Sequence, residues 1–269
     1  MDFDIGLVGY GEVGKIFTHG LKAKTGRWVG AWDLKFADAA TREAECGHAA
    51  ANGIEACASA AALCGQANLI ISAVTASNTL AVAQEVARSI RPGTLFLDFN
   101  SASPGTKAQC AALIDGAGGH YVEAGVMTSV PPYGIKVPML LGGVKATELA
   151  AVLTGWGMNA TAVAEKIGVA SAIKMCRSVM IKGLEALVIE SYTTARAYGV
   201  EEHMIPTLYE TFPGIDWNKQ GAYFFSRVAQ HGKRRAEEMR ESANTVREAG
   251  FEPFMAAAIA EKHDWVAQQ

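Results

Sequence analysis

The sequence lacks the features that mark several classes of protein. It has five cysteines among 269 residues, an odd number, and no further Cys/His pair at ligand spacing accompanies Cys46 and His48. This pattern argues against a disulfide framework and against a zinc site, so we expect reduced thiols and no metal. The other cysteines are Cys57, Cys64, Cys110 and Cys176.

A strong charge of one sign is also missing. The chain has 24 Lys and Arg against 27 Asp and Glu, which gives a formal net charge of −3. Proteins that bind a nucleic-acid backbone or an anionic membrane surface usually have an excess of positive charge, which this chain lacks. We therefore expect neither as a partner.

Long apolar runs are absent as well. A membrane helix needs about 20 consecutive apolar residues, and no run approaches that length. The first apolar run, Ile5–Val8, is too short for a secretory signal and is typical of a strand. These observations lead us to expect a cytoplasmic protein with no membrane partner.

Short β-type runs alternate with Ala-rich helical stretches through the first half of the chain. Such alternation predicts an α/β fold, with a parallel, doubly wound sheet of the Rossmann type. From about residue 166 onward no strand pattern is evident, so an all-helical domain should follow. We predict a dinucleotide-binding domain over residues 1–165 and a helical domain over residues 166–269. The expected strands are Ile5–Val8, Arg27–Trp32, Asn68–Val74, Thr94–Phe99, Gly119–Glu123 and Val137–Leu141.

A glycine-rich turn follows the first strand and opens a helix near Glu12. Gly9 permits a tight turn, Gly11 lets a pyrophosphate approach the backbone, and Gly14 lets the helix pack closely on the strand. The helix N-terminus offers N–H groups and partial positive charge to phosphates. The predicted dinucleotide-binding turn consists of Gly9, Tyr10, Gly11, Glu12, Val13 and Gly14.

An acid, Asp33, follows the second strand, 22 residues after Gly11. In this fingerprint such an acid accepts hydrogen bonds from the adenosine ribose, which favours NAD over NADP. Lys35 leaves NADP possible, and a turn or helix-capping role for Asp33 remains an alternative. Val74 and Thr75 end another strand at the same edge and are predicted to contact the cofactor. A simple helix cap at Ser77 is the other interpretation of that segment.

A long helix is predicted within residues 165–200. Winding it at 100° per residue places Lys174, Ser178, Lys182 and Glu185 on one side, with Arg177 at the edge. A solvated charged face is one interpretation of this stripe. The other interpretation is a catalytic face.

Four segments, in order, resemble motifs of the β-hydroxyacid dehydrogenases, which include 3-hydroxyisobutyrate and 6-phosphogluconate dehydrogenases. "GLVGYGEVG" resembles the cofactor turn of that family, and "FLDFNSASPGTKAQ" resembles its Asp-x-Ser-Thr-x-x-Pro segment. "YVEAGVMTSV" resembles the substrate loop, and "GVASAIKMCRS" resembles the motif that carries the catalytic lysine. The chain departs from the family at Ser178, where Asn is usual, and at Thr128–Val130, where Ser-Gly-Gly is usual.

The resemblance implies hydride transfer between a β-hydroxyacid and NAD, with NADP possible. It assigns the general acid/base to Lys174, assisted by Ser178, and adds Asn100 to the cofactor site. Burial near cationic neighbours should lower the pKa of Lys174 and supply its neutral amine. The implied substrate-binding groups are Ser101, the segment Met127, Thr128 and Ser129, and the two cations Arg177 and Lys182.

For Arg177 and Lys182, an ion pair with Glu185 or with a neighbouring helix is the alternative. The active site is expected where the helical domain meets the carboxyl ends of the strands. The resemblance also implies a homodimer formed through the helical domain.

Two other functions stay open at this point. One is an imine reductase of the same architecture, against which Lys174 argues, because the lysine position of such enzymes is typically occupied by another residue. The other is a non-catalytic dinucleotide sensor, since a fold alone does not settle function.

Overall fold

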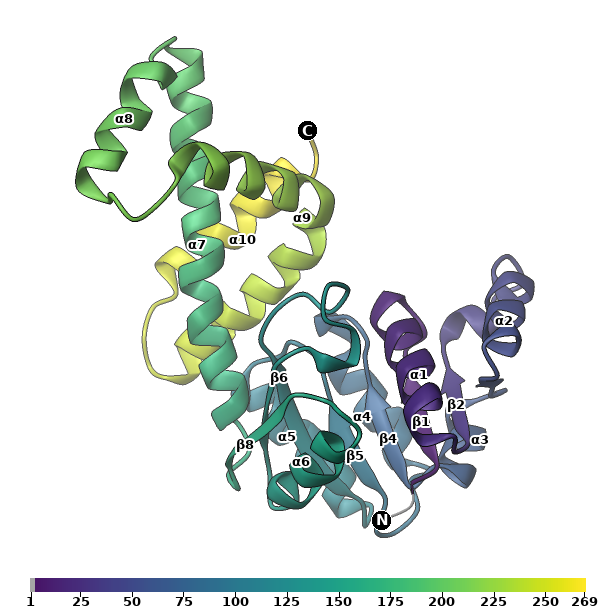
Figure 1. Cartoon of the computed structure of the whole chain (residues 1–269). Helices are drawn as coiled ribbons and strands as arrows, with labels where there is room; N and C mark the ends of the chain where they lie inside the picture. Colours follow the sequence, from purple (N-terminus) through teal and green to yellow (C-terminus); the bar gives the residue numbers. More distant parts are fainter. Residues whose placement is uncertain (1–2) are drawn as a thin grey trace. The chain divides into compact units, whose positions relative to one another are not determined.

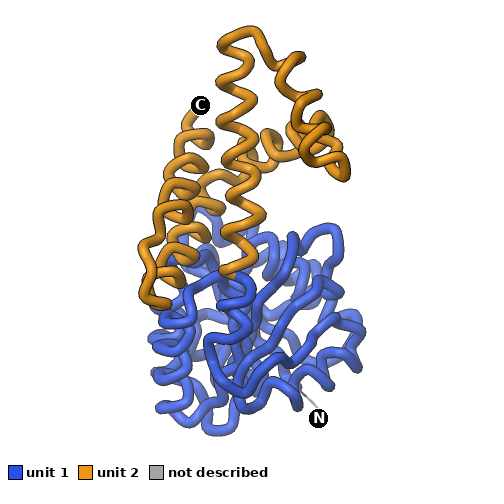
Figure 2. The backbone as a smooth tube through the Cα atoms, turned by 90° about the vertical axis from the view of Figure 1, so that its left-hand side faces the viewer, with its two compact units in different colours: residues 1–174 blue, residues 175–269 orange. Residues whose placement is uncertain are grey.

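The computed structural model describes residues 3–269, which divide into two compact units, Met1–Lys174 and Met175–Gln269 (Figure 2). The division falls within one long helix, α7, which spans Val169–Ala197. The sequence suggested a boundary between two functional domains after residue 165, and that boundary remains a prediction. Each unit has its own buried core, and each is described separately below.

The first unit is built on one eight-stranded sheet in the order β3-β2-β1-β4-β5-β6-β7-β8. Helices cover it on both sides, as Figure 1 shows. The strands are β1 (Ile5–Val8), β2 (Val29–Trp32), β3 (Glu55–Ala56), β4 (Leu69–Ser72), β5 (Leu95–Asp98), β6 (His120–Val126), β7 (Met139–Gly142) and β8 (Ala160–Ala164). The helices are α1 (Glu12–Thr25), α2 (Arg42–Ala51), α3 (Ala60–Gln66), α4 (Thr79–Ala87), α5 (Pro104–Gly116) and α6 (Ala146–Gly155), with 3₁₀ turns at Leu34–Phe36, Ala76–Asn78 and Gly134–Lys136.

The central strands β1, β2, β4 and β5 are buried along their whole length, because helices lie over both faces. Their sequences accordingly contain runs such as "LIIS" and "LFLD", without the alternation of a half-exposed strand. The Rossmann-type α/β fold expected from the sequence is confirmed.

The sheet departs from a purely parallel arrangement at one position. Strands β1 to β6 are parallel, β7 pairs with β6 antiparallel, and β8 pairs with β7 in parallel. The last two strands therefore run opposite to the other six. The connection of residues 127–138 makes this reversal without a crossover helix.

The second unit is entirely helical, as the sequence predicted. It contains the remainder of α7 with α8 (Glu201–Thr211), α9 (Trp217–Glu248) and α10 (Phe254–Val266). One apolar cluster joins α7, α9 and α10, and a second cluster, which includes Tyr192 and Trp217, joins α7, α8 and α9. None of the helices over residues 3–269 combines the length and the apolar character needed to cross a membrane.

Candidate functional site

The glycine turn between β1 and α1 has the shape of a phosphate cradle. Gly9 has a φ of 100°, and a Cβ there would lie 2.4 Å from the carbonyl oxygen of Ala73. A Cβ on Gly14 would lie 2.0 Å from the carbonyl oxygen of Gly9. A Cβ on Gly11, by contrast, would meet no atom within 4 Å. Two glycines therefore close the turn and the third leaves open space at the helix N-terminus, which fits a dinucleotide pyrophosphate.

Asp33 follows β2 and fastens this turn. One carboxylate oxygen accepts a hydrogen bond from the backbone N–H of Tyr10 at 2.6 Å, and the other accepts from the N–H of Lys35 at 2.9 Å. Asp33 is thus a capping residue, which was the alternative interpretation, while its predicted contact with the ribose remains a prediction. The Tyr10 ring is buried, and its hydroxyl lies 3.0 Å from Nδ1 of His48.

Asn100 joins the ends of β4 and β5. Its Oδ1 accepts from the backbone N–H of Val74 at 2.7 Å, and its Nδ2 donates to the Ser72 hydroxyl at 2.9 Å. The Cβ position of Gly9 is 3.0 Å from a methyl carbon of Val74, so the glycine turn adjoins this segment. The predicted cofactor residues Val74, Thr75 and Asn100 therefore follow the carboxyl ends of neighbouring strands.

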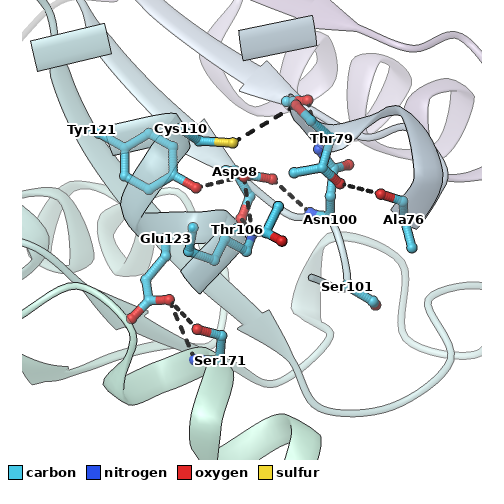
Figure 3. Close-up of polar contacts among 12 residues, drawn as sticks. Ala76, Thr79, Asp98, Asn100, Ser101, Thr106, Cys110, Tyr121, Glu123 and Ser171 are labelled. Carbon is cyan, nitrogen blue, oxygen red and sulfur yellow. Dashed lines mark hydrogen bonds and ion pairs between the residues drawn. The ribbon is translucent and has the colours of Figure 1, made fainter. Parts of the chain in front are cut away.

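A buried ion pair between Asp98 and Lys107 holds the segment that leads to Asn100 and Ser101. Figure 3 shows the contacts of Asp98 with Asn100 and Tyr121. Asp98, the last residue of β5, accepts from the N–H of Asn100 at 2.8 Å and pairs with Lys107 of α5 at 3.0 Å. The Tyr121 hydroxyl donates to the same carboxylate at 2.5 Å. Burial, and then the negative charge of Asp98, raise the pKa of Tyr121, so this phenol remains a donor.

The predicted catalytic lysine contacts the predicted substrate serine. Lys174 is half-buried, and its Nζ donates to Oγ of Ser101 at 2.5 Å. Both residues belong to the first unit, of which Lys174 is the last residue. The sequence motifs are 73 residues apart, and the fold brings them together at the carboxyl end of β5.

Glu123 of β6 fixes the start of the helix that carries Lys174. Its fully buried carboxylate accepts from the backbone N–H groups of Gly168, Ala170 and Ser171 at 2.8, 3.0 and 3.4 Å. It also accepts from the Ser171 hydroxyl at 2.5 Å, a contact drawn in Figure 3. A carboxylate at this position satisfies N–H groups that have no intrahelical partner and complements the helix dipole.

Gly125, two residues along β6, lets α7 lie close to the strand. A Cβ at this position would be 2.9 Å from the carbonyl oxygen of Ala170 and 3.4 Å from Cβ of Lys174. The segment after β6 contains the predicted substrate residues Met127, Thr128 and Ser129, of which Thr128 is exposed. Their contact with a substrate remains a prediction.

The other predicted residues of α7 belong to the second unit. Ser178 and Lys182 are buried, and Nζ of Lys182 lies 2.8 Å from Oε2 of Glu238 on α9 and 3.4 Å from Oγ of Ser178. Burial lowers the pKa of Lys182, and the Glu238 carboxylate opposes that effect. The ion pair with a neighbouring helix, the alternative raised from the sequence, is thus the arrangement observed.

Arg177 is exposed, and Glu185 pairs with Arg235 of α9 rather than with Arg177 or Lys182. Roles for Arg177 and Lys182 in binding substrate remain predictions.

Sequence reasoning did not single out the residues that support the site. Asp98 was noted only as part of a motif, and Lys107, Tyr121 and Glu123 were not assigned roles. An acid in the middle of the apolar strand "YVEAGV", and a lysine in a helix that covers the sheet, are the signals that point to them. Among the described residues, no group of three or more His, Cys, Asp or Glu is arranged to hold a metal ion.

Two family models match this chain. Residues 4–161, more than half of the sequence, match the NAD binding domain of 6-phosphogluconate dehydrogenase. The chain belongs to the β-hydroxyacid dehydrogenase family. Residues 195–266 of this family member match a domain of unknown function, DUF1932. The first unit is therefore a domain that binds NAD or NADP.

Solved structures of similar proteins share this fold. A conserved hypothetical protein from Sinorhizobium meliloti 1021 is 39% identical, with a TM-score of 0.81 over 100% of this β-hydroxyacid dehydrogenase family member and 89% of that chain. A 3-hydroxyisobutyrate dehydrogenase from Mycobacterium tuberculosis, described with L-serine, is 17% identical, with a TM-score of 0.77 over 100% and 95% of the two chains. A reductive aminase from Aspergillus terreus, described with NADPH, cyclohexanone and allyl amine, is 14% identical, with a TM-score of 0.62 over 100% and 94%. At these low identities the last two comparisons concern the fold alone.

Proposed function

We propose that this chain is an NAD(P)-dependent oxidoreductase acting on a β-hydroxyacid, with Lys174 as the general acid/base. The observation that supports this most directly is the contact between Nζ of Lys174 and Oγ of Ser101. Ser101 directly follows Asn100, which is bonded to Val74 beside the glycine turn. The amine of Lys174 therefore lies at the carboxyl ends of the strands, where folds of this type bind their dinucleotide, and this position supports its proposed role in proton transfer.

The proposed roles follow from the chemistry of each side chain. The glycine turn of Gly9–Gly14 would hold the dinucleotide, whose nicotinamide would supply the acceptor for a hydride from the substrate carbon that bears the hydroxyl. The neutral amine of Lys174 takes the proton of that hydroxyl as the carbon–oxygen double bond forms. Ser101 orients the amine, and with the Met127–Ser129 segment it contacts the substrate carboxylate. Ser178 assists the proton transfer, and Arg177 and Lys182 are the candidates for a second anionic group.

Replacement of the lysine tests this proposal. We expect Lys174→Ala to lower kcat by a factor on the order of 10² or more, because the general base is removed, while NAD(H) still binds. Turnover is measured over a panel of β-hydroxyacids with each cofactor, and cofactor binding by titration calorimetry. Lys166→Ala is a matched control, since Lys166 is exposed and precedes α7.

Unchanged turnover in Lys174→Ala would contradict the assignment of the base. Turnover of a cyclic imine with NADPH, and of no hydroxyacid, would favour the reductase alternative. Cofactor binding with no turnover of any substrate would favour the sensor. The homodimer implied by the family is part of the proposal, and light scattering on the purified protein checks it.

A further inference from the structure

Three charged side chains gather beside the residue that marks the ribose end of the dinucleotide site. Asp33 follows β2, where this fold holds the adenosine ribose. Lys35 donates its backbone N–H to Asp33, and Nζ of Lys15 lies 5.6 Å from the ring centroid of Tyr10, whose N–H also binds Asp33. The third side chain is Glu45, which comes from α2.

Glu45 engages both lysines. Its Oε2 lies 2.7 Å from Nζ of Lys15, and its Oε1 lies 3.9 Å from Nζ of Lys35. The close contact with the Lys15 ammonium is the main cause that lowers the pKa of the Glu45 carboxyl, so this group is ionised at neutral pH. The Glu45 side chain is 17% exposed, whereas Lys15 is 31% and Lys35 is 47% exposed, so the carboxylate is the most buried of the three.

The charges decide what this end of the site can accept. A 2′-phosphate carries between one and two negative charges at neutral pH and needs unoccupied cations to hold it. Lys15 and Lys35 are the cations on hand, but Glu45 and Asp33 bring an equal number of negative charges. A ribose with a free 2′-hydroxyl needs only an acceptor, which Asp33 provides.

We propose that Glu45 is a specificity-determining residue, which selects NAD over NADP by occupying Lys15 and Lys35. The inference rests on the proposed function only in requiring that the first unit bind a dinucleotide. It adds a second carboxylate, outside the glycine fingerprint, to the residues that set cofactor preference.

The test measures cofactor affinity, which does not depend on knowing the substrate. Glu45→Gln keeps the size of the side chain and releases both lysines. We expect its Kd for NADP⁺ to fall about tenfold, as for one gained charge-assisted contact, with a change of less than about threefold for NAD⁺. Adding Lys15→Gln or Lys35→Gln to Glu45→Gln should reverse the gain. Glu43→Gln is the matched control, because it removes the same charge from an exposed position on the same helix.

Four results would overturn the inference. An unchanged Kd for NADP⁺ in a folded Glu45→Gln variant would show that the lysines do not reach the 2′-phosphate. An equal gain in NADP⁺ affinity in Glu43→Gln would show that the effect comes from the change in net charge and not from release of the two lysines. A wild-type chain that binds NADP⁺ more tightly than NAD⁺ would contradict it directly. Failure of the wild-type chain to bind either dinucleotide would also defeat the cofactor site, whereas absence of turnover with normal binding would defeat only the enzymatic proposal.

Discussion

The three glycines of the dinucleotide turn serve two different physical needs, and this difference can be measured. Gly14 is required by the fold, since its Cβ would lie 2.0 Å from the Gly9 carbonyl oxygen. Gly11 has a φ of −80° and open space around it, so the fold itself tolerates a side chain there. The space at Gly11 is the space that a pyrophosphate would use.

We therefore expect opposite outcomes from two alanine substitutions. Gly11→Ala should lower the free energy of unfolding by less than about 1 kcal/mol, because the half-buried N-cap position has room for a methyl group and loses only the capping preference of Gly over Ala, and it should weaken NAD⁺ binding. Gly14→Ala should destabilise the protein by roughly 1–3 kcal/mol through forced displacement of the turn. Urea unfolding and calorimetric titration of both variants check this. Equal stability of the two variants would count against the described turn.

At this scale the motifs named residues that the structure brings into contact, such as Lys174 with Ser101 and Asn100 with Val74. Lys174, Ser101, Asn100 and the glycine turn were all expected from their motifs, although their roles toward ligands remain predictions. The ion-pair partners of charged residues on α7 were harder to predict from the sequence. That Lys182 pairs with Glu238, and that Glu185 pairs with Arg235, depends on how α7 and α9 pack, and no spacing within α7 determines it.

At the scale of elements, the start of α7 depends on a side chain from another element. The acceptor for the N–H groups of Gly168 and Ala170 is Glu123, 45 and 47 residues earlier in the chain. A helix ordinarily takes its cap from the residue just before it, so this dependence couples β6 to the position of Lys174.

We expect Glu123→Ala to lower the free energy of unfolding by roughly 2–4 kcal/mol, because it leaves buried N–H groups without an acceptor. It should also lower kcat, since the helix that positions Lys174 loses its anchor. Glu148→Ala is the control, because the ion pair of Glu148 with Lys145 is exposed and should contribute less than about 1 kcal/mol. Chemical unfolding followed by fluorescence, together with turnover, provides both readouts. A loss of stability no larger than that of the control would refute the capping role.

Elements with a strong pattern were predicted to within a few residues, and weak ones were missed. The expected strands at Ile5–Val8 and Thr94–Phe99 agree with β1 and β5. Strand β3 has only two residues and β8 reads "ATAVA", so neither has the run of β-branched and aromatic residues that predicts a strand. The antiparallel direction of β7 is set by tertiary packing, and the local sequence gives no indication of it.

At the scale of whole units, the second unit contains a buried imidazole that has no hydrogen-bond partner. His263 of α10 is fully buried, and within the described residues neither ring nitrogen is bonded. Burial, followed by the positive charges of Arg235 and Lys182, lowers the pKa of His263 to about 4, while Glu238 and Asp264 oppose this shift. The native unit therefore holds His263 neutral.

This arrangement makes stability depend on pH with a definite sign. Between about pH 6.5 and pH 4 the unfolded chain binds a proton at His263 and the native unit does not, so the free energy of unfolding falls as the pH falls. From this residue we expect a loss of about 2 kcal/mol between pH 7 and pH 5, absent in His263→Leu. His203→Leu, at an exposed position of α8, is the control. Equal pH dependence in wild type and His263→Leu, measured by urea unfolding, would contradict the prediction.

The reversed strands β7 and β8 fix the polarity of the helix that follows them. Because β8 runs opposite to β1–β6, the chain leaves it at the amino edge of the main sheet, and α7 then ascends along β6 from Glu123 toward the Ser101 side. With β7 and β8 in the common direction, α7 would begin at the carboxyl edge and descend, which would take Lys174 away from Ser101. The number of strand reversals before residue 165 therefore decides whether a lysine on this helix can lie beside Ser101. An engineered chain that gains or loses one reversal there should still bind its dinucleotide but should lack the base that we propose.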